Sequence, residues 1–285
     1  MKKIFVTGAT GFIGQYVVQQ LLEGGHYVIA TSANKQKALN FSWFPKVDYI
    51  ELDFKNINQS IDYFAFFGKP DLMIHLAWEG LPNYKSLFHF ENNLPNHYWF
   101  LKNLIGNGLK DLLITGTCLE YGMREGSLTE DMSVQPDNPY ALAKDTLRKF
   151  LHELQKTNPL CLKWVRLFYM YGKGQNPNSL LSQLENALEN DEKFFKMSAG
   201  DQTRDYLHVA TVAEYIIKIA LQQKITGIIN CSSNNPITVK AFVENYLRQK
   251  NKSIKLNLGH YPYPDYEPMH FWGDNNKLKR IITNE

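Results

Sequence analysis

Apolar side chains in the first half of the chain form short runs, and stretches with helical spacing separate them. The runs predict strands at residues 4–6, 27–30, 49–52, 72–77 and 112–115. After the first run, apolar residues recur at helical spacing from Phe12 to Leu22, and Gly24 and Gly25 are expected to end that helix. Strands that alternate with helices in this way predict β-α-β units and a parallel sheet.

The alternation weakens in the second half of the chain. A helix is expected to begin near Pro139 and a strand to cover residues 162–168, but loops rich in Pro and Asn then appear at 174–178 and 261–264. We expect these loops to cover a site. The predicted cofactor-binding domain spans residues 1–168, with about 205–232 returning to it, and the predicted substrate-binding lobe comprises 169–204 and 233–285.

Composition narrows the class of protein. The 285 residues are 44% hydrophobic and 13% aromatic, and the net charge of +3 is spread along the chain. No basic stripe suggests nucleic acid or an anionic membrane, and no stretch suggests a signal peptide or a membrane span. An odd number of separated cysteines argues against a disulfide framework, so a cytoplasmic location is expected. These cysteines are Cys118, Cys161 and Cys231.

A glycine-rich turn follows the first predicted strand. Gly8, Gly11 and Gly14 lie between that strand and its helix, where glycines allow a sharp turn and close approach of the backbone to a pyrophosphate. The helix N-terminus supplies free N–H groups and a favourable dipole. The turn therefore predicts a Rossmann doubly wound α/β fold with a dinucleotide contacted by Gly8, Thr10, Gly11, Phe12, Ile13 and Gly14.

The end of the second predicted strand bears on which dinucleotide binds. NAD enzymes place a carboxylate there for the ribose 2′-hydroxyl, whereas this chain has Ser32 and then Lys35. These residues would tolerate or attract a 2′-phosphate. NADPH is therefore the expected cofactor, with NADH or NAD as the alternative.

Tyr140 and Lys144 lie four residues apart at the start of a predicted helix, which Asn138 is expected to cap. A nearby ammonium stabilises a phenolate, so this pair suits acid–base catalysis. Thr117, at the end of the fifth strand, is the expected third catalytic residue, which would hold a substrate carbonyl oxygen. Thr115 is its rival.

Together these segments make the chain resemble the extended short-chain dehydrogenase/reductases that act on nucleotide-linked sugars. The resemblance covers nearly the whole chain. It implies that the cofactor is also contacted by Asp53, Phe54, Leu76, Ala77, Trp78, Asn93 and Thr115, in addition to Tyr140 and Lys144.

The resemblance also implies a nucleotide-diphosphate sugar as substrate. Arg204 would clamp the diphosphate, with a structural salt bridge as the alternative. Glu120 would either orient the substrate or support a neighbouring residue, and Tyr169 replaces the usual substrate-binding Asn. The implied substrate contacts are Glu120, Tyr169, Ser179, Leu180, Arg204 and Tyr206, and no metal ligands are assigned.

Departures from the family pattern narrow the expected reaction. Dehydratases carry an Asp-Glu pair where this chain has Cys118 and Leu119, so elimination of water is disfavoured. We expect NADPH-dependent reduction of a nucleotide 4-keto-6-deoxyhexose, with dTDP-4-dehydro-6-deoxy-D-glucose as the first candidate, in the synthesis of surface polysaccharide such as lipopolysaccharide O-antigen. The alternatives are a nucleotide-sugar 4-epimerase with tightly bound NAD and a non-catalytic NADP-binding regulator. The resemblance suggests a homodimer.

Overall fold

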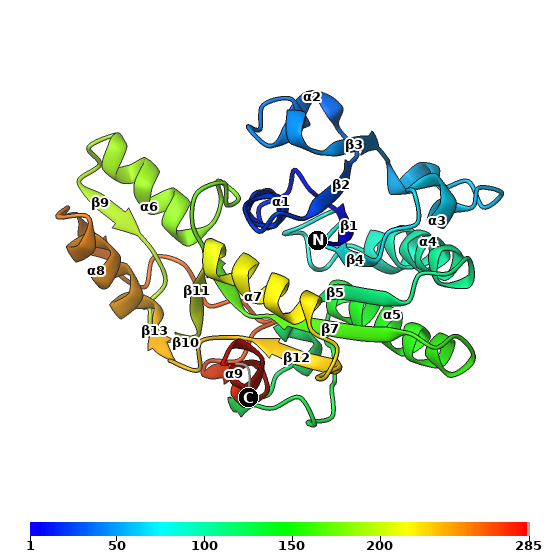
Figure 1. Cartoon of the computed structure of the whole chain (residues 1–285). Helices are drawn as coiled ribbons and strands as arrows, with labels where there is room; N and C mark the ends of the chain where they lie inside the picture. The colour runs from blue at the N-terminus through cyan, green and yellow to red at the C-terminus, as the bar shows by residue number, and fades with distance from the viewer. Residues whose placement is uncertain (284–285) are drawn as a thin grey trace.

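A central parallel sheet organises the protein, whose computed structural model describes residues 1–283. Within these residues, seven strands lie in the order β12-β7-β5-β4-β1-β2-β3 (Figure 1). All neighbouring strands run parallel. The strands are β1 (Lys3–Thr7), β2 (Tyr27–Ser32), β3 (Asp48–Glu51), β4 (Leu72–His75), β5 (Asp111–Thr117), β7 (Cys161–Leu167) and β12 (Gly227–Cys231). The predicted parallel α/β sheet is thus confirmed.

Strand ends differ from the prediction at two places that matter for the site. β5 continues to Thr117, whereas β4 stops at His75, two residues before the predicted end. The N–H groups of Leu76 and Ala77 donate to the side-chain hydroxyl of Thr7, the last residue of β1, at 3.2 and 3.3 Å. That hydroxyl replaces the strand partners that the two N–H groups would otherwise need.

Alternate side chains of the strands feed two apolar cores. Ile4 and Val6 of β1 face one core, and Phe5 between them faces the other. The first core is covered by α1 (Gly14–Glu23), α7 (Val209–Leu221) and α9 (Asn276–Ile282). The second is covered by α4 (Leu94–Gly106) and α5 (Pro139–Thr157), with Phe67 just beyond α3 (Tyr63–Phe66). A short helix, α2 (Lys35–Ala38), follows β2.

A smaller group of elements lies to one side of the sheet (Figure 1). Helices α6 (Leu180–Glu189) and α8 (Val239–Gln249) share a separate apolar cluster with β9 (Phe194–Lys196) and β14 (Lys255–Asn257). The predicted domain limits remain a prediction, although α9 packs against α7 and β12 rather than within this cluster. The remaining paired strands are β8 (Tyr169–Tyr171) with β11 (Tyr206–His208), β10 (Thr203–Arg204) with β13 (Ile237–Thr238), and β6 (Gly126–Leu128) with β15 (Phe271–Gly273).

The carboxyl edge of the sheet gathers the predicted site residues. The chain leaves β1 for β2 on one side, while β4 lies on the other, so the strand order reverses at β1. Ligands of open α/β sheets bind at such a switch point. The register places Thr7 beside His75 and Thr117 beside Leu167 at this edge. Among residues 1–283, no helix is both long enough and apolar enough to cross a membrane.

Candidate active site

The glycine turn joins β1 to α1 and has no room for side chains at its key positions. Gly8 has a φ of +68°, and a Cβ there would lie 2.9 Å from the Ala77 nitrogen. A Cβ on Gly14 would overlap the Gly8 carbonyl oxygen. No side chain within residues 1–283 caps the start of α1. The N–H groups of Gln15 and Tyr16 already donate to the carbonyl oxygens of Gly11 and Ile13, so a ligand would bind the N–H groups of the turn that precede them. This arrangement fits the pyrophosphate of a dinucleotide.

The ends of β2 and β3 carry the residues expected to choose the dinucleotide. Ser32 Oγ lies 2.8 Å from the Tyr49 hydroxyl, and the exposed Lys35 starts α2. Glu51 is paired with Ser32 in the sheet, and its carboxylate accepts the Lys35 backbone N–H at 2.9 Å. The structure therefore brings a carboxylate to an edge where the second strand itself supplies none.

Three further predicted cofactor contacts lie near β4. Asp53 caps the short 3-10 helix η2 (Phe54–Asn56) by accepting the Lys55 N–H at 2.9 Å. The ring of Phe54 is buried and stacks on His97, with 4.3 Å between ring centroids. Asn93 is also buried, and its amide donates to the Glu79 carbonyl oxygen at 2.9 Å.

Tyr140, Lys144 and Thr117 line one cavity of about 270 Å³, together with Phe12, Ile13, Leu76, Trp78 and Thr115. Asn138 caps α5, as predicted, by accepting the Ala141 N–H at 3.0 Å. Lys144 lies one turn beyond Tyr140, and its Nζ donates to the Thr115 carbonyl oxygen at 2.9 Å. Thr115, the alternative to Thr117, therefore contacts Lys144 through its backbone carbonyl oxygen. The Thr115 hydroxyl instead donates to the His75 carbonyl oxygen.

Burial shifts the pKa values of the predicted catalytic pair, Tyr140 and Lys144, in opposite directions. It lowers the pKa of Lys144 to about 7, against the charge of Glu120, which raises it. It raises the pKa of Tyr140 well above the usual value, and the nearby Thr117 hydroxyl opposes this shift. The phenol of Tyr140 therefore keeps its proton at neutral pH until a stronger base develops beside it.

A buried carboxylate fixes the turn that carries Thr117. The Thr117 hydroxyl accepts the Leu119 N–H at 3.2 Å, while Glu120 accepts the Thr117 N–H at 2.9 Å. This reciprocal pair is a capping box at the start of the 3-10 helix η4 (Cys118–Tyr121). The Thr117 oxygen accepts this hydrogen bond, and its one O–H hydrogen can be donated either to the Tyr140 oxygen or to a substrate oxygen.

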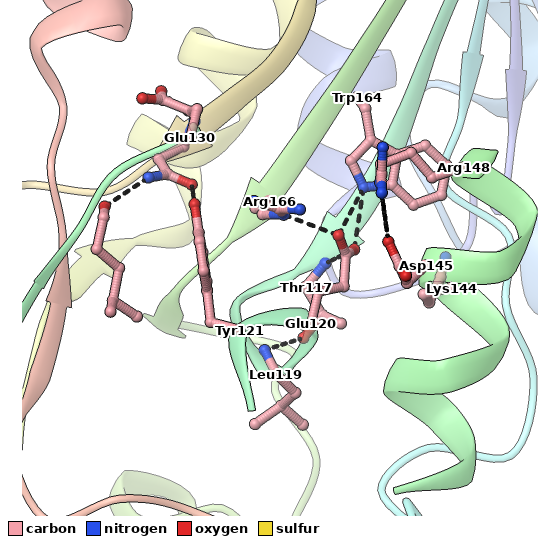
Figure 2. A network of polar contacts seen from close by, with 12 residues as sticks. Thr117, Leu119, Glu120, Tyr121, Glu130, Lys144, Asp145, Arg148, Trp164 and Arg166 are labelled. Carbon is pink, nitrogen blue, oxygen red and sulfur yellow. Dashed lines mark hydrogen bonds and ion pairs between the residues drawn. The ribbon is translucent and has the colours of Figure 1, made fainter. Parts of the chain in front are cut away.

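Figure 2 shows the Glu120 carboxylate enclosed by side chains of β7. It accepts hydrogen bonds from Trp164 Nε1 at 3.0 Å and from Arg166 Nε at 2.8 Å. Glu120 is fully buried, and among residues 1–283 it is absent from the lining of the catalytic cavity. The geometry favours the supporting role over direct contact with substrate.

A second cavity of about 460 Å³ adjoins the first and contains four of the predicted substrate contacts. It is rich in aromatic side chains, and Tyr206 stacks on Phe242 with 3.8 Å between ring centroids. Tyr169 and Glu267 line both cavities. The predicted contacts in this cavity are Tyr169, Ser179, Leu180 and Tyr206.

Arg204 lies behind the cavity walls rather than in them. Its Nη2 donates to Glu267 at 3.0 Å, and its Nη1 donates to the carbonyl oxygens of Thr203 and Met269. The salt bridge that sequence reasoning kept as the alternative is therefore present. Glu267, which sequence reasoning missed, is the charged group that faces both cavities.

Tyr84 was also missed. Its ring centroid lies 5.5 Å from that of Tyr140, and its carbonyl oxygen accepts the Tyr140 N–H at 3.1 Å. Both Tyr84 and Glu267 come from loops, where neither periodicity nor a motif distinguishes them. The Pro-containing loop at 261–264, expected from the sequence to cover a site, was the signal that this part of the chain approaches the cavities.

Known proteins resemble this chain in sequence over most of its length. The family model described as the NAD dependent epimerase/dehydratase family matches residues 4–232. A dTDP-6-deoxy-L-talose 4-dehydrogenase (NAD(+)) of Aggregatibacter actinomycetemcomitans is 28% identical over 271 residues, 95% of this chain and 98% of the relative. A UDP-glucose 4-epimerase of Halalkalibacterium halodurans is 27% identical over 74% of this chain and 68% of its own length.

Solved structures share the fold at lower identity. UDP-glucose-4-epimerase from Stenotrophomonas maltophila, with bound NAD and formylated UDP-arabinopyranose, has a TM-score of 0.87 at 16% identity, covering 99% of this chain and 93% of that one. The family match covers most of the chain and includes both the glycine turn and the Tyr140–Lys144 pair. The chain therefore belongs to the NAD dependent epimerase/dehydratase family.

Proposed function

We propose that the protein reduces the 4-keto group of a nucleotide-linked 4-keto-6-deoxyhexose, with dTDP-4-dehydro-6-deoxy-D-glucose as the first substrate to test. One observation carries the proposal: Thr117, Tyr140 and Lys144 line a single cavity beside the dinucleotide turn. The relative from A. actinomycetemcomitans adds support, because its name describes oxidation at position 4 of a dTDP-linked 6-deoxyhexose. Reduction at that position is the same chemistry in reverse.

The roles of the residues follow from their hydrogen-bonding capacity. When bound, a nicotinamide cofactor, held by the glycine turn of residues 8–14, would supply a hydride for the ketone carbon. The Thr117 hydroxyl donates a hydrogen bond to the ketone oxygen, and the Tyr140 phenol transfers its proton to that oxygen as negative charge develops on it. The Lys144 ammonium stabilises the resulting phenolate, which regains a proton from solvent. The sum is addition of one hydride and one proton to the ketone.

NADPH is the cofactor we propose, on the basis of Ser32 and the exposed Lys35 at the end of β2. Glu51 favours NADH instead, because its carboxylate lies beside Ser32 and binds the Lys35 N–H. NAD also appears in the name of the relative from A. actinomycetemcomitans. Initial rates with NADPH and NADH at equal concentration decide between the two cofactors.

The diphosphate role of Arg204 requires a rearrangement. Arg204 lines neither cavity, and three of its N–H groups already donate to protein acceptors, so its side chain must move before its remaining N–H groups can bind a substrate phosphate. Until then, Glu267 faces the substrate cavities with a hydrogen-bond acceptor suited to sugar hydroxyls. We further expect a homodimer, since Leu142 and Phe150 expose apolar surface on α5.

The central experiment incubates the purified protein with each cofactor and a panel of dTDP-, CDP-, GDP- and UDP-linked 4-keto sugars. The expected result is cofactor oxidation together with formation of the 4-hydroxy product, identified by mass spectrometry. Tyr140→Phe should lose nearly all activity, while Tyr27→Phe, at an exposed tyrosine where β2 begins, should keep it. Equal activity in wild type and Tyr140→Phe would contradict the proposal.

A nucleotide-sugar 4-epimerase is the second candidate, because the same tyrosine–lysine pair serves both directions of hydride transfer. The relative from H. halodurans, named a UDP-glucose 4-epimerase, favours it. An epimerase retains its NAD through the cycle, so tightly bound NAD in the purified protein, with interconversion of UDP-hexoses and no net cofactor consumption, would identify it. Exchangeable cofactor with net oxidation supports the reductase.

A further inference from the structure

Trp78 lies against Lys144 inside the active site. The Lys144 Nζ is 4.1 Å from the centroid of the Trp78 ring, which places the ammonium over its π-face. The indole is itself held in place. Its Nε1 donates to His89 Nδ1 at 3.1 Å, and the ring stacks on His97 with 4.9 Å between centroids.

The hydrogen bonds define which histidine nitrogens carry protons. The Thr7 hydroxyl accepts the N–H groups of Leu76 and Ala77, so its own hydrogen goes to His75 Nδ1 at 2.8 Å. His75 Nε2 must then carry hydrogen and donate to His97 Nδ1 at 2.9 Å. Burial lowers the pKa of His75 to about 3 and lowers that of His97 as well. Both rings are therefore neutral, and the layer behind Trp78 adds no charge.

The surroundings of Lys144 offer little other compensation for burying an ammonium. Its side chain is 2% exposed, and its one protein hydrogen bond within residues 1–283 goes to the Thr115 carbonyl oxygen. The Glu120 carboxylate acts on it from η4, but that charge is also paired with Arg166. The other titratable groups around it are His75 of β4, His89 of the π-helical turn η3 (His89–Asn93), His97 of α4 and Tyr140 of α5.

We propose that Trp78 is a positioning residue for Lys144, holding its side chain as a charged ammonium beside Tyr140 through a cation–π contact. The inference rests on the proposed role of Lys144 in the reductase. It gives Trp78 a function distinct from the cofactor contact predicted from the sequence. Among the described groups around Lys144, the Trp78 indole both contacts the ammonium and is itself fixed by two neighbours. His89 accepts its N–H, and His97 stacks on its ring.

The test measures the titration of Lys144 directly in the full-length, cofactor-free protein. The ¹³Cε resonances of labelled lysines are followed against pH, and the Lys144 signal is assigned by its loss in Lys144→Met. In Trp78→Leu the midpoint should fall by roughly one pH unit, because a desolvated cation–π contact strengthens proton binding roughly tenfold. Trp78→Phe should fall between wild type and Trp78→Leu, since its ring attracts cations less strongly.

Phe194→Leu is the matched control, since it removes a lysine–aromatic contact, that of Lys255 at 5.4 Å, from the exposed surface of the lobe. It should leave the Lys144 midpoint unchanged. An unchanged midpoint in Trp78→Leu, or an equal fall in Phe194→Leu, would overturn the proposal. If Trp78→Leu does not fold, the midpoint of Trp78→Phe decides alone.

Turnover gives a second readout. The fall in kcat/KM at high pH should begin at lower pH in Trp78→Phe than in wild type, because Lys144 loses its proton earlier. The NMR titration needs no substrate. A protein that reduces none of the keto sugars would therefore refute the proposed function, while the titration would still decide the role of Trp78.

Discussion

Replacing Glu120 should affect stability and catalysis together. In Glu120→Ala, the guanidinium of Arg166 loses its counter-ion while its side chain stays 1% exposed. The Trp164 Nε1–H and the Thr117 N–H lose their acceptor in the same step. The substitution therefore leaves one buried charge and two buried donors unpaired.

The magnitude follows from that count. Breaking a buried ion pair on one side costs about 3–5 kcal/mol. An unpaired buried donor costs about 1–3 kcal/mol by itself. These costs do not simply add here, because all three groups bind the same carboxylate. We therefore expect Glu120→Ala to lower the free energy of unfolding by at least about 3 kcal/mol, a large share of the roughly 5–15 kcal/mol of a typical domain. Glu120→Gln keeps one acceptor oxygen and should lose less, about 1.5–3 kcal/mol.

Urea unfolding followed by fluorescence and circular dichroism measures these differences. The matched control is the buried pair of Lys163 and Asp111, joined at 2.6 Å near the opposite ends of the same strands. Asp111→Asn should reduce stability and leave kcat of the folded enzyme unchanged, whereas Glu120→Ala should reduce both because the Thr117 N–H loses its acceptor. A stability loss below about 1 kcal/mol in Glu120→Ala, or full kcat in the folded Glu120→Ala enzyme, would refute this reasoning.

Three further predictions concern the cofactor and pH. Gly14→Ala should weaken dinucleotide binding at least roughly tenfold, because the new Cβ would overlap the Gly8 carbonyl oxygen. Calorimetry measures the Kd, and an unchanged Kd would argue against this turn as the cofactor site. Glu51→Gln should raise the ratio of kcat/KM for NADPH to kcat/KM for NADH, because a carboxylate beside Ser32 disfavours a 2′-phosphate. A constant ratio would exclude Glu51 as a determinant of cofactor preference. In the wild type, kcat/KM for reduction should fall as pH rises through about 7, where Lys144 loses its proton; a flat profile would mean that this ammonium is not required.

Local patterns in the sequence were enough to predict the features that depend on neighbouring residues. The strands, the glycine turn and the cap of α5 by Asn138 depend on contacts within a few positions, and the structure confirms each of them. The spacing of Tyr140 and Lys144 likewise fixes their shared helix face once the helix is known.

Contacts that depend on strand register or on distant loops could not be predicted from local sequence patterns. Glu51 approaches the end of β2 only because β3 pairs in register with it. Glu267 reaches Arg204 from 63 positions further along the chain, so its pairing is invisible until the last loop is placed over the cavities. Glu120 stood out in the sequence, but its partners Trp164 and Arg166 come from a neighbouring strand.

The support of Thr117 by β7 has a consequence for how new specificities can arise. The carboxylate, indole and guanidinium that fix the turn carrying Thr117 all belong to the sheet and its edge, while most of the second cavity is built by loops and by α6, α8, β8 and β11. If the proposed roles hold, sequence drift in those loops can reshape the walls of the second cavity without moving the Thr117 hydroxyl. A library confined to residues 176–182 and 261–268 is therefore the natural starting point for redirecting the enzyme to other sugars, with the chemistry held constant.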